Sequence, residues 1–179
     1  MTETEFPTLV RPARVVVGVT GSTSSAAALR RAVVEARRTG SVLMPVLAWE
    51  PPGGEVAYRF APVPSLAALW ERQARARLDA AITGALGELP ADLRVEPTVV
   101  RAPAAWALTE LADGPQDLLV LGAGPRSRFA RMLRGAVRRG AAVRTRTPLL
   151  LVSPLARPGR VRRDLRRISP DDFRAPTGG

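Results

Sequence analysis

The sequence predicts an α/β fold, a single doubly wound domain with a five-stranded parallel sheet and helices on both faces. Short β-branched and apolar runs alternate with segments of helical periodicity, the pattern of strands joined by crossover helices. The chain of 179 residues suits one core of ordinary size. The hydrophobic fraction is 46%, and no apolar run approaches the roughly 20 residues of a membrane-spanning helix. We therefore expect one globular domain that does not enter a membrane.

The first strand and the first helix are expected within residues 14–39. Residues 14–20 read RVVVGVT, a run typical of a central strand buried on both faces. Gly21 and the Ser/Thr residues 22–25 supply turn and N-cap chemistry, and Gly40 stands where a helix C-cap belongs. Between them, apolar residues recur at helical spacing: Ala26, Leu29, Val33 and Ala36.

A second strand is expected at residues 42–49, with a bulge or an unpaired position at Pro45, since proline has no N–H for a ladder. Residues 50–64 hold four prolines and two glycines, which predicts a long loop over the sheet. A helix begins at Ser65, because apolar residues then repeat every fourth position: Leu66, Trp70, Ala74, Leu78, Ile82 and Leu86.

The rest of the domain contains three candidate strands. We expect strands at 93–101, 117–121 and 149–152, and helices at 104–112 and 129–144. Pro97 indicates that the strand at 93–101 lies at a sheet edge.

Three missing residue types exclude many mechanisms. The sequence has no histidine, cysteine or lysine. It therefore has no Ser-His-Asp triad, no soft ligands for zinc or iron–sulfur centres, no Walker lysine and no Schiff base. We expect a protein that is not an enzyme and holds no metal. The N-terminal residues 1–10 are acidic rather than basic and lack the apolar centre of a secretory signal, which predicts a cytoplasmic location.

The net charge of +11 is carried by arginine alone. Such a charge attracts anions and nucleic acid, although a GC-rich coding sequence also explains the choice of arginine over lysine. Arg131, Arg134 and Arg138 form a stripe at helical spacing, and the tail from Leu155 to Gly179 is also arginine-rich. The stripe is either a solvated face or a surface for anions, nucleic acid or an acidic partner. Few aromatic residues accompany it, so we do not expect specific nucleic-acid binding.

Two loops follow strands at the sheet edge where ligands bind in open parallel sheets. The first, TGSTSS at 20–25, either receives an anion at a helix N-terminus or only caps that helix. The second, GAGPRSR at 122–128, either binds phosphate through its glycine backbone, Arg126 and Arg128, or is only a strand-to-helix turn.

Two longer segments resemble the signature regions of the universal stress protein family. They are VVVGVTGSTSSAAALRRAVVEA near the start and DLLVLGAGPRSRFARMLRGAVRRGAAVRTRTPLLLVSP near the end. The resemblance implies a domain at 13–154 between tails at 1–12 and 155–179, with strand order 3-2-1-4-5. It also implies a homodimer in which the fifth strands of two subunits pair, here Leu149, Leu150, Leu151 and Val152.

The family's nucleotide-binding motif is altered in this sequence. Where the family has an aspartate after strand one, this sequence has Thr20. At the strand-two position that would pack on adenine, it has Ala48. In the glycine motif, Gly122 and Gly135 keep the outer spacing, but Pro125 replaces the inner glycine. The full candidate site for a nucleotide or anion is Thr20, Gly21, Ser22, Ala48, Gly122, Gly124, Pro125, Arg126, Arg128, Gly135, Ala136 and Val137.

Each departure removes a ligand contact. Pro125 offers no N–H to a phosphate, Ala136 offers no hydroxyl, and Thr20 offers no carboxylate to a nucleoside. We therefore expect a stress-response or regulatory protein with a degenerate site whose ligand, if it has one, is an anionic metabolite or nucleotide. The first alternative is a working ATP or AMP binder with at most very slow hydrolysis. The second is a protein that binds nucleic acid or an acidic partner through its arginines.

Overall fold

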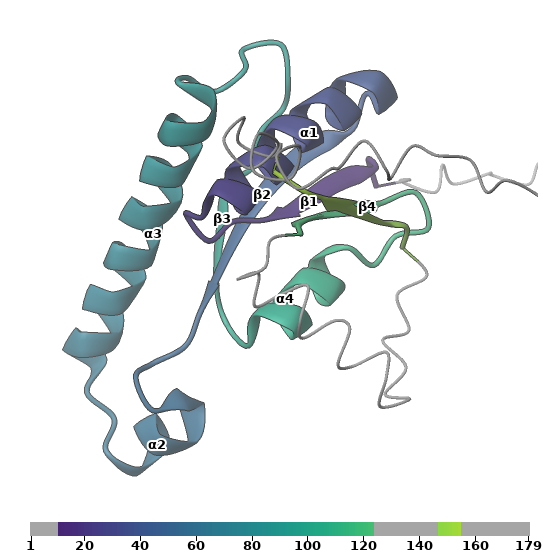
Figure 1. Cartoon of the computed structure of the whole chain (residues 1–179). Coiled ribbons are helices and arrows are strands. Elements are labelled where there is room, and N and C mark those ends of the chain that lie inside the picture. The colour runs from purple at the N-terminus through teal and green to yellow at the C-terminus, as the bar shows by residue number, and fades with distance from the viewer. Residues whose placement is uncertain (1–10, 124–146, 155–179) are drawn as a thin grey trace, which may run out of the picture.

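The sheet has five parallel strands in the order β3-β2-β1-β4-β5, as predicted (Figure 1). The computed structural model describes residues 11–123 and 147–154. The helix expected at 129–144, the arginine stripe and the tail at 155–179 lie outside the described residues. Strand order reverses between β1 and β4. Open parallel sheets bind ligands beyond the carboxyl ends of the strands at such a point. We call this side of the sheet the ligand edge.

The described elements follow the predicted alternation of strand and helix. The strands are β1 Arg14–Gly18, β2 Val42–Trp49, β3 Thr98–Arg101, β4 Leu118–Gly122 and β5 Leu149–Val152. The helices are α1 Thr23–Thr39, α2 Gly54–Phe60, α3 Pro64–Leu86 and α4 Ala104–Leu111. The third strand is shorter than expected, because only the single bridge between Leu43 and Val95 pairs the chain ahead of Thr98.

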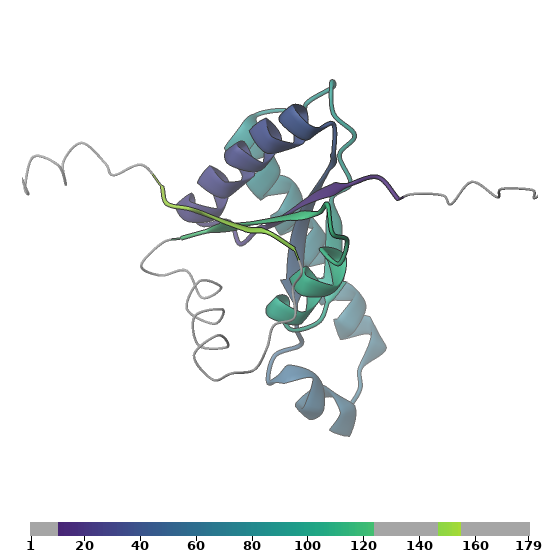
Figure 2. The ribbon, with the colours of Figure 1, turned by 90° about the vertical axis from the view of Figure 1, so that its right-hand side faces the viewer.

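Helices cover both faces of the sheet, which confirms the doubly wound prediction (Figures 1 and 2). On one face α1 and α3 pack against the strands and bury Leu29, Leu43 and Leu78. On the other face α4 buries Leu108 against Val16 and other strand residues. Burial on both faces explains why the central strands read as continuous apolar runs rather than as alternating ones.

Helix α1 begins and ends at the residues that the sequence predicts. The Ser22 hydroxyl accepts a hydrogen bond from the N–H of Ser25 at 3.2 Å, which makes Ser22 the N-cap. Gly40 adopts a left-handed conformation with φ of 63°, and its N–H bonds to the carbonyl of Ala36. The start of α1 is thereby fixed at the ligand edge of the sheet.

Pro45 lies within β2, and its missing N–H leaves an unpaired position on one side only. The β1 ladder runs through it, with Val17 opposite Pro45. On the β3 side, pairing stops after the Leu43–Val95 bridge and resumes at Val46 and Thr98. The prediction of an unpaired position is therefore confirmed toward β3.

Residues 50–64 are not the continuous loop that the sequence predicted, because they contain α2. This seven-residue helix has no buried residue, so it carries no apolar periodicity for sequence reasoning to detect. The prolines flank it, and Gly53 and Gly54, with φ of 82° and 85°, form the turn that leads into it. The Arg101 guanidinium holds it to β3, through two hydrogen bonds to Glu55 and by stacking 4.4 Å from the Tyr58 ring centroid.

Helix α3 buries only the second half of its predicted apolar stripe. Ala74, Leu78 and Ile82 are buried, whereas Leu66 is 41% exposed. Figure 1 shows the reason: the first turns of α3 extend past the sheet toward α2, where no strand lies beneath them. The helix therefore packs on the sheet from about Ala74 onward, and within this part Arg77, Ala80 and Ala81 line the pocket described below.

Candidate functional site

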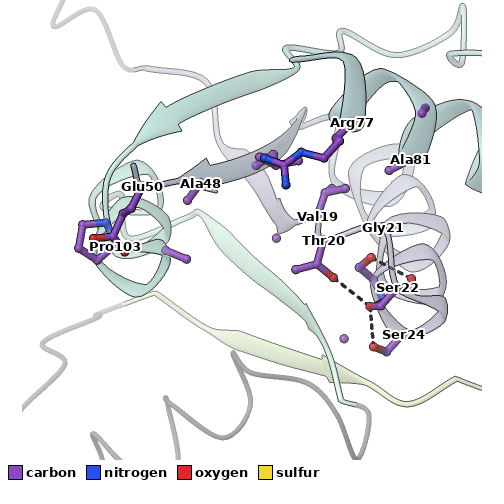
Figure 3. A pocket seen from close by; sticks show the side chains of 16 residues that line it. Val19, Thr20, Gly21, Ser22, Ser24, Ala48, Glu50, Arg77, Ala81 and Pro103 are labelled. Atoms are coloured by element: carbon purple, nitrogen blue, oxygen red, sulfur yellow. Dashed lines mark hydrogen bonds between the residues drawn. The ribbon is translucent and has the colours of Figure 1, made fainter. Parts of the chain in front are cut away.

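The described residues enclose a pocket of about 830 Å³ at the carboxyl ends of β1, β2 and β4 (Figure 3). The residues that line it are Gly18, Val19, Thr20, Gly21, Ser22, Ser24, Ser25, Leu47, Ala48, Glu50, Arg77, Ala80, Ala81, Pro103, Ala104 and Gly122. Its walls come from the loop after β1, the start of α4 and the middle of α3. A volume of this size is typical of small-molecule sites, and its position at the strand-order reversal is where such sites occur.

Hydroxyl groups line one wall of this pocket. Thr20 Oγ1 and Ser22 Oγ lie 2.9 Å apart, and Ser22 Oγ lies 3.0 Å from Ser24 Oγ, so the three hydroxyls form a hydrogen-bonded chain. Gly21 has φ of 75°, which turns the chain from the strand into the helix. The two interpretations of this loop are compatible, because Ser22 caps α1 and the same loop lines the pocket.

Gly122 has a packing role that the sequence did not reveal. A Cβ atom placed on it would lie 2.4 Å from the carbonyl oxygen of Ser24 and 2.9 Å from the nitrogen of Ser25. The end of β4 therefore passes directly against the first turn of α1, and only glycine fits between them. This contact fixes the floor of the pocket, whether or not the Gly122 backbone also meets a ligand.

Five of the predicted site residues line the pocket together: Thr20, Gly21, Ser22, Ala48 and Gly122. The other seven lie outside the described residues: Gly124, Pro125, Arg126, Arg128, Gly135, Ala136 and Val137. The structure therefore brings together the three candidates that follow β1, Ala48 near the end of β2 and the first residue of the glycine motif.

Two charged pocket residues were missed at the sequence level. Glu50 directly follows β2, and Arg77 extends from α3 toward Ala48 (Figure 3). The rule that drew attention to Thr20, that ligands meet residues just beyond strand ends, applies equally to Glu50. Arg77 directly precedes the buried Leu78, a position at the border of the apolar stripe that helical periodicity alone does not mark as functional.

The described residues carry no further signal of a metal or a membrane. They contain no group of three or more carboxylate side chains arranged to hold a metal ion. Within the same residues, no helix combines the length and the apolar character needed to cross a bilayer.

The fold and this pocket define a class of protein: an open parallel α/β domain with a pocket at the strand-order reversal. The sequence model of the universal stress protein family matches residues 13–153. The chain belongs to this family, which confirms the resemblance.

Several solved structures are similar to this chain. A universal stress protein in complex with cAMP is 32% identical, over 80% of this chain and 98% of that protein, with a TM-score of 0.46. Protein Rv1636 from Mycobacterium tuberculosis H37Rv is 27% identical, over 80% of this chain and 97% of that protein, with a TM-score of 0.35. The hypothetical protein MJ0577 is 13% identical, over 83% of this chain and 100% of that protein, with a TM-score of 0.56, which supports the fold alone. No curated protein sequence matches the chain.

Proposed function

We propose that this chain is a non-enzymatic regulatory member of the universal stress protein family that binds a small anionic ligand in the pocket described above. The observation that carries the proposal is the pocket itself, which combines a hydroxyl-lined wall with an apolar floor at the ligand edge. Catalysis has little support, since the sequence has no histidine, cysteine or lysine to act as base or nucleophile.

The pocket lacks the carboxylate that the resemblance implies for the family's nucleotide binders. Thr20 occupies that position, and its hydroxyl bonds to Ser22 within the loop. A hydroxyl carries no charge and makes weaker hydrogen bonds to a nucleoside than a carboxylate does. The absence of a carboxylate at this position argues against ATP bound as in the family's nucleotide binders, and it favours a different ligand.

An adenine nucleotide with a single phosphate is the second candidate. The observation that favours it is the solved relative in complex with cAMP, which is 32% identical to this chain. Such a ligand needs fewer phosphate contacts than ATP, so the changes at Pro125 and Ala136 weaken its binding less.

Thermal unfolding with a ligand panel tests the proposal. A ligand at 100 times its dissociation constant adds about 2.7 kcal/mol of stability, which raises the melting temperature by several degrees in a chain of this size. We expect no such rise with ATP at about 1 mM, and a rise with AMP, cAMP or the small molecule that native mass spectrometry finds bound to the purified protein. Stabilisation by ATP alone would contradict the proposal, as would the absence of any stabilising or co-purifying small molecule.

We also propose that the protein is a homodimer through β5. This strand lies at the sheet edge, and Leu149 and Leu151 on it are 41% and 46% exposed. An exposed apolar edge strand is an aggregation hazard unless another strand or chain covers it. Leu150 and Val152, in contrast, pack against the core.

The dimer prediction is tested with Leu151→Lys. We expect sedimentation velocity to show a dimer for the wild type and a monomer for this variant, because an ammonium group cannot be buried unpaired at an apolar interface. Leu89→Lys is the matched control, since Leu89 is 49% exposed but lies far from β5 in the sequence, after α3. A monomeric wild type, or equal dissociation by both variants, would show that β5 is not the interface.

A further inference from the structure

Two charged side chains of the pocket come from elements outside the predicted ligand loops. Among the described residues that line it, only Glu50 and Arg77 are charged. Glu50 directly follows β2, and Arg77 lies in α3, whose middle forms the opposite wall. Figure 3 shows the Arg77 side chain reaching from the helix toward Ala48, with Glu50 on the other side of Ala48 in this view.

Neither charge is paired with another side chain in the part of the protein that the structure describes. Within residues 11–123 and 147–154, neither Glu50 nor Arg77 makes an ion pair or a side-chain hydrogen bond. Other arginines on the same face of the sheet are used differently. Arg31 and Arg38 both bind the buried Glu35 of α1, and the hydrogen bonds from Arg38 and Arg31 lower the pKa of that carboxyl. Those arginines serve the fold, whereas Arg77 is left facing the pocket.

A second hollow places the same pair at the centre of a larger concave surface. This hollow of about 620 Å³ adjoins the first and is lined by Trp49, Glu50, Pro52, Trp70, Gln73, Ala76 and Arg77. Glu50 and Arg77 are the residues that line both hollows. These two side chains therefore stand where the two hollows meet.

Glu50 lies close to the position where the family's nucleotide binders have an aspartate and this chain has Thr20. Strands β1 and β2 are neighbours, with Gly18 opposite Val46, so the same register places Thr20 level with Ala48. Glu50 stands two residues further along, a rise of about 7 Å in a strand. A carboxylate is thus present at the ligand edge, but it comes from the end of β2 rather than from the end of β1.

We propose that Glu50 and Arg77 are the charges that recognise the ligand of this pocket. The Glu50 carboxylate accepts hydrogen bonds from ligand hydroxyl or amino groups, and the Arg77 guanidinium binds the ligand's anionic group. The ligand class is a small molecule that carries both kinds of group, for which a nucleoside monophosphate is the simplest probe. The inference rests on the proposed function and makes it more specific. In this inference the charges that recognise the ligand are still present, but they come from the end of β2 and from α3 instead of from the end of β1.

Arg77→Gln tests the anion contact. We compare AMP with adenosine by isothermal titration calorimetry, since the two probes differ only in the phosphate. A charge-assisted hydrogen bond is strong enough that its loss weakens AMP binding about tenfold or more. Adenosine binding should change less than about twofold, because the lost partner is the phosphate. Arg75→Gln is the matched control, as Arg75 lines a different hollow on α3.

Glu50→Gln tests the carboxylate contact. This change keeps the shape and one acceptor oxygen but removes the charge, so we expect adenosine and AMP to weaken alike, about fivefold or more. Glu71→Gln is its control, since Glu71 also lines the hollow that holds Arg75. Both test residues are exposed, so thermal unfolding of the unliganded variants should match that of the wild type.

The outcomes separate this inference from the proposed function. A wild type that binds AMP while Arg77→Gln and Glu50→Gln bind it equally well contradicts the inference and leaves the function standing. Equal losses of AMP and adenosine in Arg77→Gln also contradict the assigned role of the guanidinium. A wild type that binds neither AMP, adenosine nor inorganic phosphate, and that neither cAMP nor a co-purifying small molecule stabilises, contradicts both the inference and the function on which it rests.

Discussion

Replacing Gly122 with alanine should lower the stability of the protein by about 3 kcal/mol or more. The new Cβ atom would lie 2.4 Å from the carbonyl oxygen and 2.5 Å from the carbonyl carbon of Ser24. Both are backbone atoms, so no side chain can rotate away to relieve the contact. The first turn of α1 is also held by the cap at Ser22, and the strain must therefore be taken up by moving β4 or the helix.

Urea unfolding followed by circular dichroism measures this loss. Gly84→Ala is the matched control, because a Cβ at Gly84 in α3 meets no atom within 4 Å. Alanine in an open helix interior is expected to stabilise by about 0.5–1 kcal/mol. If Gly122→Ala unfolds at the same urea concentration as the wild type, the close approach of β4 to α1 is wrong.

Gly122 also shows what kind of information the sequence holds. Its place in the glycine motif predicted a role at the ligand edge, and the structure places it at that edge. The contact with Ser24 could not be predicted, because it joins two segments about a hundred residues apart whose relative heights depend on the packing of α1. Gly122 belongs to a ligand-binding motif and is also required by packing, but the structure shows directly only the packing requirement.

The elements that were predicted well are those whose own residues determine them. Buried central strands read as apolar runs, and α1 has both its caps in the sequence, at Ser22 and Gly40. Helix α2 was missed because it buries nothing and depends on Arg101, which is distant in the sequence and holds Glu55 and Tyr58. Local patterns predict elements that bury a face, but not those whose contacts come from remote side chains such as Arg101.

The candidate site divides in the same way. Thr20 and Ala48 were predicted because they stand at strand ends within a recognisable motif. Arg77 was not predicted, since its role depends on where the middle of α3 lies across the sheet. Part of the charge in the pocket thus depends on how α3 packs on the sheet. A sequence motif at the strand ends cannot predict that packing.

A second large loss of stability is expected for Asp117→Ala. The Asp117 side chain is 2% exposed and accepts hydrogen bonds from the N–H groups of Arg14 and Gly114, both at 2.9 Å. It also pairs with the Arg11 guanidinium at 2.6 Å. One carboxylate thus ties the start of β1 to the turn that precedes β4.

Removing this carboxylate leaves two backbone donors and a guanidinium without their shared acceptor. Each backbone donor that loses its acceptor costs about 1–3 kcal/mol, so the two N–H groups together are a large part of the total for a domain of this size. Asp113→Ala is the matched control, because Asp113 pairs with the same guanidinium at 2.8 Å but its side chain is 67% exposed. An exposed pair of this kind contributes about 0–1 kcal/mol. Urea unfolding should therefore separate the two variants by about 2 kcal/mol, the loss from the two unsatisfied donors less that of the exposed pair. Equal midpoints would mean that the buried carboxylate does not hold β1 to β4.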